Sequence, residues 1–143
     1  MNGTRPNLNV VTLGVSDLKR SVKFYRDGLG LPTSAKEDDP IAFFSLNGTV
    51  LALFGRKSLA EDAGVSYEGG GFPGFTLAQN VRSEKEVDQA FEAVRRLGAK
   101  VVKEPQKASW GGYSGYFADP DGYLWEVAYN PFWKLDDKGN VSL

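Results

Sequence analysis

Two residue types central to enzyme chemistry are missing, because the 143-residue sequence contains no histidine and no cysteine. The chain therefore has no imidazole base that titrates near neutral pH and no thiolate nucleophile. It also has no nitrogen or sulfur ligand for zinc, nickel or iron. Without cysteine the chain cannot form the disulfide bonds that are typical of proteins in oxidising compartments. The N-terminus also lacks the charged start and apolar core of a signal peptide. We therefore expect a cytoplasmic protein.

Long apolar runs and blocks of like charge are missing too. With 17 basic and 18 acidic residues the net charge is -1, and no basic block is longer than a pair. No apolar run reaches the roughly 18 residues of a membrane span. We therefore expect neither nucleic acid nor a membrane as a partner. The hydrophobic content of 41% instead indicates a globular domain that can bury a core without disulfides or metal.

The apolar and turn patterns divide the chain into two similar modules. The first, about residues 7–56, has a helix that Asp17 caps and strand patterns at 7–15, 31–37, 41–46 and 49–54. The second, about residues 74–131, has a helix that begins at the capping box Ser83–Glu86 and strand patterns at 75–81, 100–104, 112–118 and 123–129. A linker at about 57–73 with a short helix at 57–63 separates them, and a tail follows at 132–143. We interpret residues 1–143 as one internally duplicated domain.

Two motifs resemble those of the vicinal oxygen chelate superfamily. They are Val15-Ser16-Asp17-Leu18 with Phe24-Tyr25-Arg26-Asp27-Gly28-Leu29-Gly30, and Phe117-Ala118-Asp119-Pro120-Asp121-Gly122-Tyr123-Leu124-Trp125-Glu126. This superfamily includes glyoxalases, extradiol dioxygenases, fosfomycin resistance transferases and bleomycin resistance proteins. The resemblance implies an α+β fold in which two tandem βαβββ modules form one curved, incompletely closed mixed-sheet barrel with helices outside. Residues 130–135 are too apolar to stay free in solvent, so we expect this segment to dock on its own domain or on a partner subunit, and we expect residues 136–143 to be frayed. Small members commonly dimerise, so this apolar tail makes a homodimer an expected assembly.

The resemblance also locates the positions that hold metal ligands in metal-dependent members. Those four positions fall on Val10, Ala52, Phe75 and Glu126. Only Glu126 carries a donor, and one carboxylate cannot supply the three or four ligands that a catalytic metal needs. We therefore expect no metal and no cofactor, with these positions as remnants of a lost site.

The pair Asn47-Gly48 favours a two-residue hairpin of type I′, which would pair Phe43 with Ala52. Strand alternation, anchored at the four ligand positions, predicts which side chains face a cavity. The resemblance to the fosfomycin resistance branch adds an inward Ser114 and Tyr116, and Trp110 lies in a glycine-rich segment that reads either as an aromatic flap or as an ordinary turn. The candidate ligand-binding residues are Thr12, Phe43, Ala52, Phe54, Phe75, Gln79, Trp110, Ser114, Tyr116 and Glu126. An apolar wall with a few polar groups is typical of small-molecule pockets. The alternative is that the aromatic residues belong to the core.

Glu126 has three interpretations: an acid or acceptor that faces the ligand, a structural partner of Thr12 or Tyr116, or a remnant in a solvated cleft. Asp17, Asp119 and Asp121 are interpreted as cap and turn residues. The leading functional hypothesis is a metal-free protein that binds and sequesters a hydrophobic or aromatic compound, without catalysis. The alternative is a metal-independent lyase or isomerase that uses Glu126 as its acid or base. An interaction module with a filled cavity is a third hypothesis, and a metal-dependent lactoylglutathione lyase or dioxygenase is the least favoured.

Overall fold

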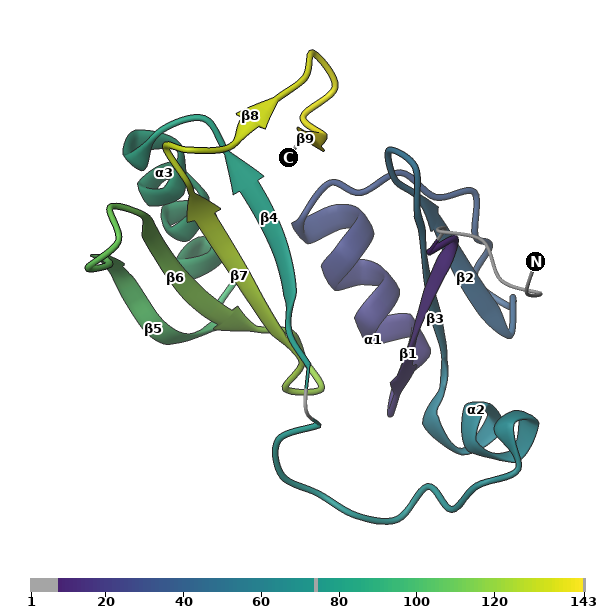
Figure 1. The fold of residues 1–143 in the computed structure, drawn as a ribbon. Coiled ribbons are helices and arrows are strands. Elements are labelled where there is room, and N and C mark those ends of the chain that lie inside the picture. The colour runs from purple at the N-terminus through teal and green to yellow at the C-terminus, as the bar shows by residue number, and fades with distance from the viewer. Residues whose placement is uncertain (1–7, 74, 143) are drawn as a thin grey trace, which may run out of the picture. The chain divides into compact units, whose positions relative to one another are not determined.

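The computed structural model describes residues 8–73 and 75–142, which fall into two compact units, Met1–Tyr67 and Glu68–Leu143. The division lies inside the expected linker. Each unit has its own sheet, so the two are described separately (Figure 1). No helix in the described ranges is long and apolar enough to span a membrane.

The first unit is a three-stranded mixed sheet with helical segments. Its strands lie in the order β1-β3-β2, with β1 parallel to β3 and β2 antiparallel to β3. Its elements are β1 (Val10–Val15), α1 (Leu18–Val22), the π-helix η1 (Lys23–Gly28), β2 (Ile41–Ser45), β3 (Val50–Gly55) and α2 (Arg56–Ala63). The helical segments follow the predicted pattern, including the short helix after β3.

One face of this sheet forms the core beneath α1 and η1. Leu13, Phe44 and Leu53 are at most 1% exposed, and the Tyr25 ring of η1 lies 6.0 Å from the Phe44 ring. The opposite face contains the alternate residues. The predicted hairpin register is confirmed, with Phe43 paired to Ala52. The turn is not the type I′ that an Asn-Gly pair favours, because type I′ needs positive φ at both central residues, and of these two only Gly48 has it.

The strand expected at 31–37 is reduced to one isolated bridge between Thr33 and Phe44. The Thr33 hydroxyl donates to the Phe43 carbonyl oxygen at 2.6 Å, but the chain then turns away. The Lys36 amide donates to the Asp39 carboxylate at 2.7 Å, and the Asp39 amide donates to the Lys36 carbonyl at 3.1 Å. The turn engages the amide and carbonyl groups of Lys36, which would otherwise be available to pair with a neighbouring strand.

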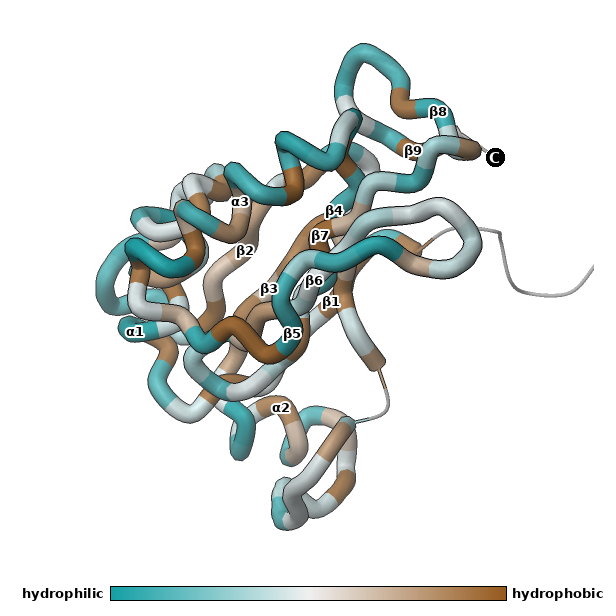
Figure 2. Tube along the Cα trace, turned by 90° about the vertical axis from the view of Figure 1, so that its left-hand side faces the viewer, coloured by the Kyte–Doolittle hydropathy of each residue, from teal (hydrophilic) through white to brown (hydrophobic). Residues whose placement is uncertain are grey.

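The second unit is a four-stranded sheet in the order β4-β7-β6-β5, with α3 on one face. Its elements are β4 (Leu77–Val81), α3 (Glu84–Arg96), β5 (Lys100–Lys107), β6 (Tyr113–Ala118), β7 (Leu124–Tyr129), β8 (Lys134–Leu135) and β9 (Val141–Ser142). The predicted cap is present, since the Glu86 amide donates to the Ser83 hydroxyl at 3.2 Å. Figure 2 shows polar and apolar residues alternating along α3, whose buried residues are Val87, Phe91 and Val94.

The two sheets repeat one connection pattern. In each unit the first strand pairs in parallel with the last strand of its module, and that last strand pairs antiparallel with the strand before it. The α+β class and the tandem modules are therefore confirmed. Each module forms an open sheet with two edges, and neither is a closed barrel.

The tail was expected to dock and then to fray from Asp136 onward, and its described part is instead ordered. Strands β8 and β9 form a hairpin whose turn is closed by the Asp136 carboxylate, which accepts from the amides of Lys138 and Asn140 at 2.9 and 2.8 Å. The Arg82 guanidinium donates to the Leu135 carbonyl at 3.2 Å. The tail up to residue 142 is therefore held on its own unit. This is the first of the two expected docking modes, in which the tail packs on its own domain.

Candidate functional site

A row of polar side chains crosses the second sheet on the face opposite α3. In the strand register Lys103 pairs with Tyr116, Tyr116 with Glu126, and Glu126 with Ala78. The opposite face is the core, where the Phe117 ring stacks on Trp125 with centroids 6.5 Å apart. Because alternate residues of a strand point to opposite faces, the row lies away from the helix. Ser114 lies in register with Ala128, so Ser114 and Tyr116 share the face of Glu126, and their role in binding a ligand stays a prediction.

Tyr116 and Glu126 form the polar centre of this row. The pKa of the Tyr116 hydroxyl is raised, first by burial and then by the charge of Glu126 and a hydrogen bond to it. At neutral pH the hydroxyl is protonated and donates to the Glu126 carboxylate, and this bond contributes to the raised pKa of Tyr116. Glu126 thus has the structural partner that one of its three interpretations required. Among the described residues, no buried side-chain nitrogen or oxygen lacks a hydrogen-bond partner.

Two predicted members of the site lie elsewhere. Gln79 pairs with Val127, on the face of α3, and Phe75 lies in the segment before β4, outside the sheet pairing. The Phe75 ring stacks on Tyr123 at a centroid distance of 5.9 Å. The prediction was wrong by one residue, and a shift of one residue exchanges the two faces of a strand. The residues of β4 that share the face of Glu126 are Ala78 and Asn80.

Sequence reasoning missed Lys103 and Gln106 on β5. They pair with Tyr116 and Ser114, so they extend the polar face to the edge of the sheet. Two register shifts interrupt the pairing of β5, between Val101 and Lys103 and between Lys103 and Gln106. Irregular pairing of this kind breaks simple alternation. Sequence reasoning could have identified these residues only by predicting that 100–107 is an edge strand that pairs with the strand of Tyr116.

Trp110 lies in the tight turn between β5 and β6, where the Ala108 amide donates to the Gly112 carbonyl at 2.8 Å. Its indole ring covers Gly112 so closely that a Cβ added there would lie 2.0 Å from the ring. The indole is nevertheless 53% exposed. Trp110 thus lies in a well-packed turn. Its interpretation as a flap that covers a ligand stays a prediction.

The first unit has a mainly apolar sheet face of its own. Thr12 and Phe43 are both in register with Ala52, on the side opposite the core residue Leu53. Phe43 is 53% exposed, whereas Ala52 is fully buried and Phe54 is half-buried. A shallow cleft of about 360 Å³ lies at the β2 edge of this face and is lined by Pro32, Thr33, Ser34, Phe43, Ser45 and Val50.

The acidic residues that motif reasoning assigned to caps and turns have those roles. The Asp17 carboxylate accepts from the Arg20 amide at 3.0 Å at the start of α1. The Asp119 carboxylate accepts from the amides of Asp121 and Tyr123 at 2.9 and 2.8 Å. Asp119 is 5% exposed and closes the turn between β6 and β7. None of these geometries indicates a catalytic or calcium-binding role.

The donors present do not fit a metal centre. In the described ranges no group of three or more His, Cys, Asp or Glu residues could hold an ion. The positions Val10 and Ala52 carry hydrocarbon side chains only. The residue of β4 in register with Glu126 is Ala78, whose methyl group offers no ligand. Glu126 remains the single carboxylate, and it is hydrogen-bonded to Tyr116.

The fold and the motifs agree with a comparison against protein families. The model of the Glyoxalase/Bleomycin resistance protein/Dioxygenase superfamily matches residues 7–127. The chain belongs to this superfamily. A solved structure, titled as a glyoxalase-related enzyme from Fulvimarina pelagi, is 36% identical with a TM-score of 0.85, covering 97% of this chain and 99% of its own.

The chain is also similar to two curated relatives, and each alignment extends over most of this chain and most of the relative. The protein YraH of Bacillus subtilis (strain 168) is 34% identical over 122 residues, which is 82% of this chain and 93% of YraH. The metallothiol transferase FosB of Lysinibacillus sphaericus (strain C3-41) is 31% identical over 124 residues, which is 86% of this chain and 82% of FosB.

Proposed function

We propose that this superfamily member binds a small hydrophobic or aromatic compound without a metal ion and sequesters it. The observations that carry the proposal are the two sheet faces that point away from the helices, one in each unit: apolar side chains are left uncovered on the first, and a few polar groups lie on the second. Phe43 is 53% and Val10 46% exposed in the first unit. In the second, Tyr116, Glu126 and Ser114 supply hydrogen-bonding groups. Apolar walls with few polar groups are what small-molecule sites require.

The test is native mass spectrometry of the protein purified from cells without added metal. We expect an organic adduct and no stoichiometric metal, in a dimer if the predicted assembly is correct. Phe43→Ser should reduce the adduct, because it removes exposed apolar area from the face. Leu97→Ser is the matched control, since Leu97 is 41% exposed at the end of α3, on the side of the second sheet away from the assigned face. Equal loss of adduct in both variants would count against the assigned face.

A metal-independent lyase or isomerase is the second candidate, and the contact between Tyr116 and Glu126 favours it. A carboxylate that holds a hydroxyl of raised pKa can accept a proton from a bound substrate, while Tyr116 stabilises the charge that develops. Glu126→Gln keeps the size of the side chain and removes the base. Loss of turnover with unchanged affinity would support catalysis, whereas a change in affinity alone would support sequestration. Glu61→Gln on exposed α2 is the control.

A metal-dependent reaction of the kind that the name of FosB implies is not favoured for this chain. The metal-ligand positions of the superfamily carry at most one strong donor here, and the sequence contains no histidine to supply another. Stoichiometric nickel, zinc or iron in the purified protein, with turnover that a chelator removes, would overturn this part of the proposal. The cytoplasmic location and the homodimer remain predictions from the sequence.

A further inference from the structure

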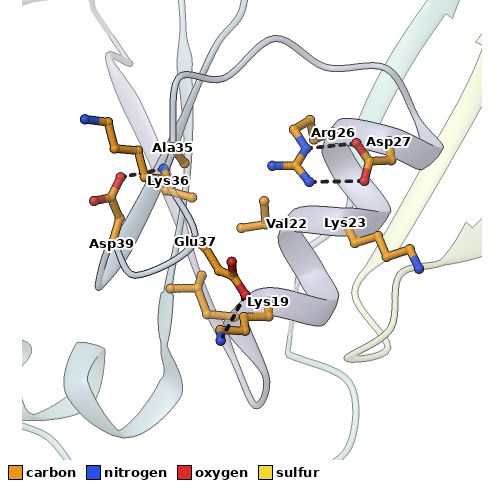
Figure 3. A pocket seen from close by; sticks show the side chains of 11 residues that line it. Lys19, Val22, Lys23, Arg26, Asp27, Ala35, Lys36, Glu37 and Asp39 are labelled. Carbon is orange, nitrogen blue, oxygen red and sulfur yellow. Dashed lines mark hydrogen bonds and ion pairs between the residues drawn. The ribbon is translucent and has the colours of Figure 1, made fainter.

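A second cavity lies on the helical side of the first unit, away from the face assigned to the proposed function. It encloses about 320 Å³ between the α1–η1 segment and residues 35–42 (Figure 3). Leu18, Val22, Ala35 and Ala42 line it with hydrocarbon. This volume is at the lower end of the range for small-molecule sites. The cavity therefore has room for a compound about the size of one substituted ring.

The charges around this cavity favour an anion. Four cationic residues line it, Lys19, Lys23, Arg26 and Lys36, against the three acidic residues Asp27, Glu37 and Asp39, which leaves an excess of one positive charge. The acids are also engaged within the protein. Glu37 pairs with Lys19 at 3.5 Å, and Asp39 accepts from the Lys36 amide at 2.7 Å.

Arg26 offers the donor that such an anion would use. Its Nε and one terminal nitrogen donate to the two oxygens of Asp27 at 2.8 and 3.1 Å. This bidentate contact holds the guanidinium plane in place and raises the pKa of Arg26. Figure 3 shows the remaining nitrogen pointing away from Asp27, toward the segment that carries Ala35. Two N–H groups on a fixed cation are thus available beside an apolar wall.

The local helix geometry also sets this region apart. Residues 23–28 form a π-helical turn, in which the Leu29 amide donates to the Phe24 carbonyl at 2.9 Å. Short π-helical turns occur frequently at functional sites. The sequence gives no sign of this cavity, because its residues come from a helix and from the segment where a strand was expected.

We propose that this cavity binds a small apolar carboxylate, with the carboxylate at Arg26 and the hydrocarbon against Val22 and Ala42. The site is independent of the one in the proposed function and does not rest on it. Lys23 and Lys36 add to the positive potential without specific pairing to the ligand. Because the cation is partly exposed, binding should weaken as salt rises.

The test is a titration of the isotope-labelled full chain with sodium benzoate, followed by two-dimensional 1H–15N correlation spectra. We expect saturable shifts in residues 18–27 and 35–42, weaker at about 300 mM than at about 20 mM salt. Benzyl alcohol, which has the same ring without the charge, should shift them little. Arg26→Gln should weaken benzoate about tenfold, the value expected for one charge-assisted hydrogen bond. Arg96→Gln, an exposed arginine on α3, should leave the affinity unchanged.

Three outcomes would overturn the proposal, and the wild-type spectra alone can give two of them. The first is no saturable shift in these residues. The second is an equal response to benzyl alcohol, which would show that the charge plays no part. The third is unchanged affinity in Arg26→Gln when its spectrum shows a folded protein. Shifts confined to residues near Phe43 or Tyr116 would assign benzoate to the site of the proposed function instead.

Discussion

Replacing Gly115 with alanine should destabilise the second unit, although the change adds a single methyl group. Gly115 lies in β6, in register with Val127 on the face of α3. A Cβ added there would lie 2.8 Å from the Lys103 carbonyl oxygen, 2.8 Å from the Phe91 ring and 2.9 Å from the Pro105 nitrogen. Two of these three atoms belong to the backbone, so rotation of a side chain cannot relieve the contact.

Overpacking of this kind typically costs about 1–3 kcal/mol. Alanine recovers roughly 0.5 kcal/mol by restricting the unfolded chain, because the backbone at Gly115 has no positive φ. We therefore expect a net loss of about 1.5 kcal/mol, which lowers the Tm of a unit of this size by about 6–12 °C.

Urea and thermal unfolding followed by circular dichroism measure this loss. Gly70→Ala is the matched control, since nothing lies within 4 Å of a Cβ added there and its φ is not positive. It should leave the Tm unchanged or raise it slightly. A Gly115→Ala protein as stable as the wild type would refute the packing described between β6, β5 and α3.

Three further predictions concern single contacts of the second unit. Tyr113→Phe removes a 2.6 Å hydrogen bond to Asp88 and should cost about 1 kcal/mol at neutral pH. Because this bond raises the Tyr113 pKa to about 12, its stabilisation is complete below pH about 10 and is lost as the pH rises toward 12, so unfolding of the variant should depend less on pH in that window. Glu126→Gln should move the Tyr116 pKa back toward its ordinary value, measured by ultraviolet titration against the wild type. Arg82→Met should speed hydrogen exchange in the tail hairpin while the Tm changes little, because the two bonds that it removes, to the Leu135 and Asp136 carbonyls, are exposed.

The sequence predicted elements that local chemistry determines. Asp17 and Ser83 cap helices as expected, because a side-chain oxygen there satisfies an amide that the helix leaves free. The pairing of Phe43 with Ala52 followed from the length of the loop between the two strands, even though the turn type differed. Tyr116 was placed beside Glu126 through the family resemblance, and the register agrees.

The errors arose where long-range pairing decides the outcome. Gln79 was assigned to the wrong face because nothing local fixes the start of β4, whose register depends on β7. Lys103 was missed because the irregular pairing of β5 is invisible in its sequence. The strand expected at 31–37 failed because Asp39 closes a turn with Lys36. The cavity near Arg26 depends on a π-helical turn for which apolar periodicity gives no signal.

The central claim is that an apolar compound binds without metal to the sheet faces opposite the helices. Its most direct test is a 1H–15N titration of the wild-type chain, in EDTA, with the co-purified compound or with Nile red as a neutral substitute. The account predicts saturable shifts at Thr12, Phe43, Ser114, Tyr116 and Glu126 that EDTA does not alter. Shifts confined to the helical sides, or binding that appears only when nickel, zinc or iron is added, would contradict it.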